Sequence, residues 1–168
     1  VNTREVGAFN YMNWEQIIEL YKSPNVEIGN HSHSHEYLVE ESPKVIKEDI
    51  LKSIKIFEKK LGKNSIFFSY PFGEYSLEFK KIIKDLGFKF AFGQHSGVID
   101  ETKDFWELPR FPINEKYGEL KRFNTLMKTL PFKYKKIYPE DKYLLQSKNP
   151  PVIKIEFYQG IKKLNNIN

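Results

Sequence analysis

The chain has 168 residues, of which 40% are hydrophobic and 29% charged, so it is long enough for one well-packed domain and too apolar for wholesale disorder. Its basic residues are almost all lysine, since only Arg4, Arg110 and Arg122 are arginines, and a net charge of +5 without a basic stripe argues against nucleic-acid binding. The absence of cysteine excludes disulfides and thiolate ligands, and no apolar run reaches the ~20 residues of a membrane-spanning helix.

The first elements are a helix, a short strand and a polar loop. Asn13 and Gln16 have the spacing of a capping box and predict a helix over 14–21. The apolar residues of 26–28 then predict a short strand that ends at a glycine. The loop that follows, 30–35, contains three of the four histidines in the chain.

Helices and strands continue to alternate in the next part of the chain. A Ser-Pro start, an apolar face and a closing glycine predict a helix over 42–62. The apolar run 66–70 predicts a buried parallel strand, the segment 76–87 a further helix, and 88–92 the next strand. This alternation favours an α/β domain with a parallel sheet, either open or closed like a barrel.

The pattern changes toward the C-terminus. The sequence predicts a short strand over 108–111 and a helix over 117–130, after which prolines interrupt the chain. Residues 152–158 alternate apolar and polar side chains, as a half-buried strand does. We therefore expect an α/β domain over 1–130, followed over 131–168 by a linker and the beginning of a β-rich segment.

The histidine-rich loop is the strongest candidate for a functional site. It follows a predicted strand, and ligands of α/β proteins gather at the carboxyl ends of strands. His31 and His35 are four residues apart, a spacing that in one helical turn directs both imidazoles at one metal ion. Neutral imidazole suits zinc, nickel, iron or cobalt, so the pair by itself leaves the metal open among these. The plainer interpretation is a solvated polar loop.

Three further residues at predicted strand ends are candidates for catalysis. The loop 69–75, which contains Phe72, can present backbone N–H groups toward an oxyanion or ring faces to a sugar, or it can be a plain turn whose aromatic rings are part of the core. His95 can act as a general acid or base, or it can be an exposed loop residue. Arg110 can orient a carboxylate, or it can be an ordinary surface arginine.

Together these segments resemble the polysaccharide deacetylases of the NodB-homology group, the family four carbohydrate esterases. Residues 27–35, Glu-Ile-Gly-Asn-His-Ser-His-Ser-His, are similar to the second motif of the family. Residues 69–73, Ser-Tyr-Pro-Phe-Gly, are similar to its third motif, Arg-x-Pro-Tyr-Gly, with Ser69 in place of the arginine. Residues 108–110 are similar to a later strand-end arginine segment. The resemblance covers about residues 10–115.

The resemblance implies a fold and a set of roles. The fold is an irregular (β/α) barrel of the NodB type, here partial, with the start of a β-rich C-terminal appendage. His31 and His35 would be metal ligands, Ser32 would brace their loop, and the N–H of Phe72 would help to hold the oxyanion. The implied partner is an N-acetylated glycan, and the implied metal, zinc, would polarise the acetamide carbonyl and activate a water molecule.

The sequence departs from the family pattern in two places. The Asp-Asp pair of the first motif should precede Asn13, but residues 1–12 contain no aspartate and the first in the chain is Asp49. The late Leu-x-His motif, which holds the general acid, is also absent, and His95 is the remaining stand-in. Because the chain begins at Val1, we expect it to be a fragment whose Asp pair lies upstream, and to be inactive as it stands.

Three functions remain open from the sequence. The first is metal-dependent removal of N-acetyl groups from a polysaccharide or oligosaccharide. The second is a catalytically inactive pseudo-deacetylase that binds carbohydrate through its aromatic residues, and the third is a metal amidohydrolase acting on a non-sugar amide. The compartment is not determined, with a slight preference for the cell envelope or the exterior over the cytoplasm.

Overall fold

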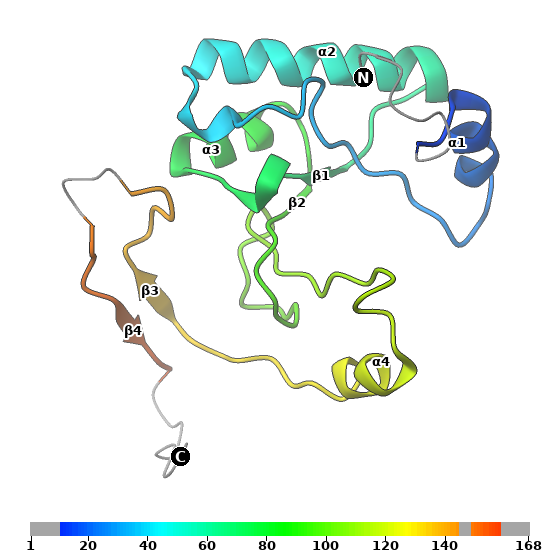
Figure 1. Cartoon of the computed structure of the whole chain (residues 1–168). Helices are drawn as coiled ribbons and strands as arrows, with labels where there is room; N and C mark the ends of the chain where they lie inside the picture. The colour runs from blue at the N-terminus through cyan, green and yellow to red at the C-terminus, as the bar shows by residue number, and fades with distance from the viewer. Residues whose placement is uncertain (1–10, 145–148, 159–168) are drawn as a thin grey trace.

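Short parallel strands and three longer helices form the first part of the protein. The structure, a computed structural model, describes residues 11–144 and 149–158 (Figure 1). Its elements in chain order are α1 (Trp14–Tyr21), the 3-10 turn η1 (Leu38–Glu40), α2 (Pro43–Leu61), β1 (Phe67–Ser69), the 3-10 turn η2 (Pro71–Gly73), α3 (Leu77–Asp85), β2 (Phe90–Phe92), α4 (Leu120–Leu126), β3 (Lys136–Tyr138) and β4 (Lys154–Glu156). The predicted alternation of helices and strands is confirmed from α2 to β2.

The parallel sheet consists of β1 and β2, which pair in register from Phe67 with Phe90 to Ser69 with Phe92. One residue extends it on each side, because Asn30 forms a parallel bridge to Phe68 and Leu108 one to Phe92. Four segments therefore lie side by side in chain order. The loops that follow them all start at one edge of the sheet.

Local signals account for the helices. Asn13 and Gln16 form both hydrogen bonds of a capping box at the start of α1. Ser42 caps α2, whose end is at Gly62 in the left-handed conformation (φ 81°), which glycine adopts without strain. Ser76 caps α3 in the same way as Ser42 caps α2.

The core lies between these helices and the two parallel strands. Helix α3 packs against α2, which runs across the top of Figure 1. Phe68 of β1 is buried against Phe79 of α3 and Phe88, with ring centroids 6.1 and 5.2 Å away, and Ile50 of α2 is fully buried in the same cluster. Burial of these large apolar side chains is the main force that holds the helices on the sheet.

The strand predicted over 26–28 is wrong. Only Asn30 pairs with β1, through its N–H to the carbonyl of Phe67 (2.9 Å) and its carbonyl to the N–H of Ser69 (2.8 Å). The next donor along β1, the N–H of Phe67, is bonded to the hydroxyl of Ser65 instead (3.0 Å). The carbonyl of Ile28 therefore has no donor on β1, and pairing stops after one residue.

Two other predicted elements are shorter than expected. The strand predicted over 108–111 is reduced to the bridge at Leu108. The helix predicted over 117–130 is limited to Leu120–Leu126. The N–H of Tyr117 closes a turn with Asn114 before it, and turns with bonds from residue i+3 to residue i follow it.

The C-terminal segment contains a separate antiparallel pair. The strand predicted over 152–158 is present as β4, and β3, which we did not predict, pairs with it from Lys136 opposite Glu156 to Tyr138 opposite Lys154. Figure 1 shows this pair apart from β1 and β2. No helix in the described ranges combines the length and the apolar character needed to cross a membrane.

The core predicts a clear difference between two residues of α2. Ile50→Ala removes a fully buried side chain and should lower the free energy of unfolding by about 2–5 kcal/mol. Val45→Ala, on the same helix but 42% exposed, should change it by less than about 0.5 kcal/mol. Urea denaturation followed by circular dichroism measures both, and equal effects would contradict this description of the core.

Candidate functional site

The structure brings His31 and His35 together at the sheet edge where β1 ends. Their ring centroids are 4.8 Å apart and the rings are nearly perpendicular (73°). The loop is not the helical turn that the spacing suggested. It bends at His33 and Ser34 instead, and the hydroxyl of Ser32 accepts the N–H of His35 across the bend (3.0 Å), so Ser32 braces the loop as expected.

The hydrogen bond of His31 leaves one of its two ring nitrogens available to bind a metal. Its Nδ1 lies 2.7 Å from the carbonyl oxygen of Ser69, and because a carbonyl only accepts, Nδ1 carries the proton. The lone pair is then on Nε2, the arrangement in which a metal-binding histidine is held by a backbone carbonyl. Partial burial lowers the pKa of His31, and the nearby charges of His35 and Arg110 lower it further against the opposing effect of Ser69. A lowered pKa favours the neutral imidazole that a metal requires.

Asn30 forms the first of two supports beneath the loop. Its side chain is fully buried, and its Oδ1 accepts the N–H of Ser32 (3.1 Å) and the hydroxyl of Ser53 on α2 (3.0 Å). Its Nδ2 donates to Asn64 (3.3 Å). A buried amide with all these partners can adopt only one position, so the residue before His31 is fixed.

Asp49 of α2 forms the second support. One carboxylate oxygen accepts the N–H of His33 (2.8 Å) and the other the N–H of Ser34 (3.1 Å), between the two candidate ligands. Hydrogen bonds to a charged acceptor are stronger than those between neutral groups. We did not predict this role, although the sequence contains a signal for it. Asp49 and Ser53 are polar residues one turn apart, on the apolar stripe of α2 that contains Ile46 and Ile50.

Three residues of the site have the left-handed backbone conformation that glycine usually adopts. They are Ser32 (φ 68°), His35 (φ 56°) and Phe72 (φ 57°), and they are the non-glycine residues with positive φ in the part of the chain that the structure describes. Each costs of order 1–3 kcal/mol, and such strain gathers at functional sites. In this conformation the ring centroid of Phe72 lies 4.9 Å from that of His35. The side chain of Phe72 is half exposed (49%).

The predicted oxyanion donor has a suitable environment. Phe72 lies in η2, where the N–H groups of Gly73 and Glu74 turn back to Tyr70 and Pro71. The N–H of Phe72 itself forms no hydrogen bond to any residue that the structure describes. It can therefore be offered to a ligand.

Arg110 and His95 lie at the same edge but differ in their relation to the histidine pair. The Nε of Arg110 donates to the carbonyl of Gly93 (2.9 Å), and its charge acts on His31. His95 makes no contact with His31 or His35. It lies near Tyr75, with ring centroids 6.5 Å apart, and burial lowers its pKa against the opposing charge of Glu107.

The donor set for a metal is incomplete among the described residues. They contain no group of three histidine, aspartate or glutamate side chains that could hold an ion, so His31 and His35 would supply at most two of the ligands that a site needs. The hydroxyl of Ser69, the residue whose backbone carbonyl bonds to His31, is buried without a hydrogen-bond partner in the described ranges. An orphaned polar atom at this position is consistent with a further group that approaches the pair.

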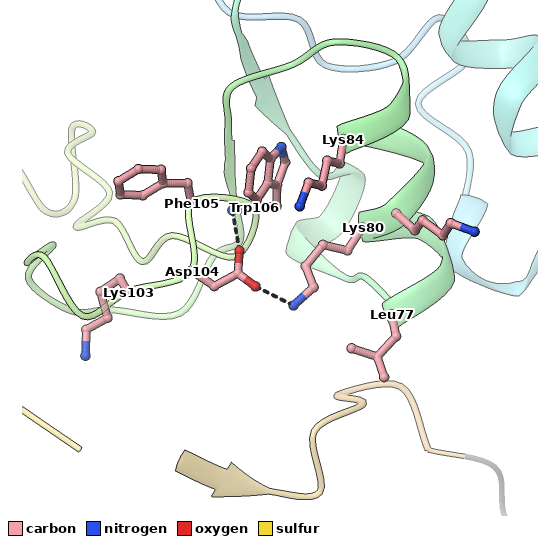
Figure 2. A pocket seen from close by; sticks show the side chains of 8 residues that line it. Leu77, Lys80, Lys84, Lys103, Asp104, Phe105 and Trp106 are labelled. Atoms are coloured by element: carbon pink, nitrogen blue, oxygen red, sulfur yellow. Dashed lines mark hydrogen bonds and ion pairs between the residues drawn. The ribbon is translucent and has the colours of Figure 1, made fainter. Parts of the chain in front are cut away.

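A further cavity, of about 480 Å³, is lined by a structural ion pair, and we do not interpret it as a ligand site. Figure 2 shows Asp104 between Lys80 of α3 and the backbone of Trp106, with hydrogen bonds of 2.9 Å to each. Lys80 also pairs with Glu107 at 2.9 Å. The charge of Lys80 is thus paired within the protein, and none of the predicted site residues lines this cavity.

The comparison with known families agrees with the resemblance found in the sequence. The family model for polysaccharide deacetylase matches residues 1–91, more than half of the chain. The chain therefore belongs to the polysaccharide deacetylase family. No match is found among curated proteins.

Solved structures of deacetylases share the fold. The Streptococcus pyogenes deacetylase PplD in complex with acetate has a TM-score of 0.65 at 22% identity, over 73% of this chain and 54% of that one. A polysaccharide deacetylase from Bacillus cereus has a TM-score of 0.62 at 21% identity, with coverages of 73% and 39%. IcaB from Ammonifex degensii has a TM-score of 0.60 at 19% identity, with coverages of 69% and 53%. The chain thus spans about half the length of these structures or less.

The support from Asp49 can be tested by its removal. Asp49→Ala leaves the N–H groups of His33 and Ser34 without their acceptor and should lower the free energy of unfolding by about 2 kcal/mol or more. The neighbouring exposed carboxylate provides the control, since Glu48→Ala should have almost no effect. Thermal unfolding of both variants measures the difference, and similar midpoints would show that the carboxylate does not hold the loop.

Proposed function

We propose that the protein acts as a metal-dependent hydrolase that removes N-acetyl groups from a polysaccharide or oligosaccharide. The observation that carries the proposal is the histidine pair, fixed on two buried supports at the end of β1 in a chain of this family. The metal is zinc or another divalent transition metal, the ions that imidazole ligands favour.

Each candidate residue then has a role. When bound, the metal would polarise the acetamide carbonyl and activate a water molecule. His31 and His35 would hold the metal, His31 through the nitrogen that Ser69 leaves unprotonated. Phe72 would donate its N–H to the oxygen that becomes negative in the transition state. Arg110 would keep a positive charge near His31, and His95 would act as the general acid.

The remaining groups would come from outside the described residues. A tetrahedral zinc site with an open position needs three protein ligands, and the family pattern adds an aspartate ligand and an aspartate base. The orphaned hydroxyl of Ser69 supports the view that a further segment approaches the pair. We infer that residues 1–130 form part of a NodB-type (β/α) barrel and that 131–168 begin a β-rich appendage.

The runner-up is an inactive pseudo-deacetylase that binds carbohydrate without hydrolysis. The incomplete donor set among the described residues favours it. In both cases the partner is an N-acetylated glycan. The two functions differ in whether acetate is released.

The experiment compares two histidines in the same loop of the full-length protein. With zinc and N-acetylglucosamine oligomers, His31→Ala should lower acetate release at least about a hundredfold, because a metal ligand is lost. His33→Ala should retain the wild-type rate, since only the backbone of His33 contributes to the loop.

Three outcomes separate the alternatives. Acetate release that survives His31→Ala would overturn the metal site. Oligomer binding without any acetate release would favour the pseudo-deacetylase. Equal losses in both histidine variants would mean that the loop as a whole, rather than one ligand, had been damaged.

A further inference from the structure

Helix α4 and the turn after it have an apolar face that the described part of the chain leaves exposed. No residue of α4 is buried. The face consists of four large apolar side chains with exposed fractions between 45% and 84%, namely Leu120, Phe123, Met127 and Leu130. Figure 1 shows α4 apart from α2 and α3, whose apolar faces meet in the core. The apolar face of α4 therefore takes no part in the core of the described residues.

These four side chains lie on one side of the segment. They are three, four and three residues apart, the spacing of one face of a helix with about 3.6 residues per turn. After the helix the N–H groups of Lys128 and Thr129 continue the winding with bonds to carbonyls three residues back. Lys121, Thr125 and Lys128 fall on the opposite side. The segment is thus amphipathic, and its polar side contains lysines.

The helix is fixed in place by an arginine on its first turn. One Nη of Arg122 donates to the carbonyl of Pro112 (3.2 Å) and to that of Tyr117 (2.9 Å). The guanidinium also lies 5.3 Å from the centroid of the Tyr117 ring. These contacts attach α4 to the segment before it, so the apolar face is already formed before anything binds to it.

The excess positive charge of the protein is concentrated around this face. Residues 111–138 contain seven basic and two acidic residues, an excess of five that equals the net charge of the whole chain. The remaining residues are therefore neutral overall. Lys121 and Lys128 are exposed, and neither forms an ion pair with a residue that the structure describes. Such a local excess of lysine attracts an anionic surface.

An anionic lipid surface fits both properties of this face. The apolar side chains can enter the boundary between headgroups and acyl chains, while the long lysine side chains reach the phosphates of the headgroups. A helix of seven residues is too short to cross a bilayer, so it would lie in the plane of the surface. A second copy of this chain fits less well, because its face would bring the same positive charge against this one.

We propose that the apolar face of α4 and the lysines around it bind the protein to the surface of an anionic lipid membrane. The inference goes beyond the proposed function, since it depends on neither the histidine pair nor a metal. The segment also lies outside the range 1–91 that the family model matches. The structure therefore assigns membrane attachment to a part of the chain separate from the candidate metal site.

The test measures sedimentation of the full-length protein with lipid vesicles. Vesicles of phosphatidylcholine mixed with the anionic lipid phosphatidylglycerol should bind the protein, and vesicles of phosphatidylcholine alone should bind it at least about tenfold more weakly. Added salt should weaken the binding, because it screens the attraction of the lysines. Equal binding to the two kinds of vesicle, or binding to neither, would overturn the proposal.

A charge variant and its matched control show whether this face is the one that binds. The double change Lys121→Gln with Lys128→Gln should weaken binding to the anionic vesicles at least about tenfold. Lys52→Gln with Lys55→Gln removes the same charge from exposed positions of α2 and should leave binding unchanged. Equal losses in the two double variants would show that net charge alone determines binding, and would overturn the proposal.

An apolar variant distinguishes the membrane from other partners of the same face. Leu120→Ser with Met127→Ser should weaken vesicle binding at least about tenfold, because two inserted apolar side chains are lost. Without vesicles it should leave the thermal unfolding midpoint and the oligomeric state of the full-length protein unchanged, since both side chains are exposed. A lowered midpoint would show that the rest of the protein covers the face, and a lost oligomer would show that a second copy does. Either result would overturn the proposal.

Discussion

The carboxylate of Asp49 accepts two consecutive backbone N–H groups of the histidine loop, and the geometry of the site depends on this contact. This contact attaches the loop to α2. The helix ends at Gly62, and its apolar face is buried in the core. Asn30 adds the link to the sheet through its bridge to Phe68. The loop is thus held from the helix and from the sheet at once, and its histidines need little reorganisation to accept a ligand.

The contacts with α2 and the sheet also hold the strained backbone of the site. Ser32, His35 and Phe72 all adopt the left-handed conformation, which local sequence alone would not maintain. The well-packed core and the buried hydrogen bonds offset this cost, so the two loops approach each other and the rings of His35 and Phe72 meet. A site built in this way is stable only as part of the folded domain.

The sequence predicted the elements that depend on local interactions and missed those that depend on contacts between distant segments. Caps such as Asn13 with Gln16, and stops such as Gly62, are local, and the predicted helices that rest on them are confirmed. The pairing of β3 with β4 joins distant segments, and the loss of the strand at 26–28 depends on a hydroxyl of Ser65, so neither could be foreseen from periodicity. The spacing of His31 and His35 correctly marked a pair, but a bend at residues 33 and 34 rather than a helical turn brings the rings together.

We propose that the supports from Asp49 and Asn30 present two imidazoles to one metal ion, with the Nδ1 of His31 committed to Ser69. A crystal structure of the full-length protein with zinc tests it most directly. We expect one ion bound by the Nε2 of His31 and by an imidazole nitrogen of His35, each at about 2.0–2.1 Å, with the bond from His31 to Ser69 retained. Zinc bound through the Nδ1 of His31, or at a place that excludes either histidine, would contradict it.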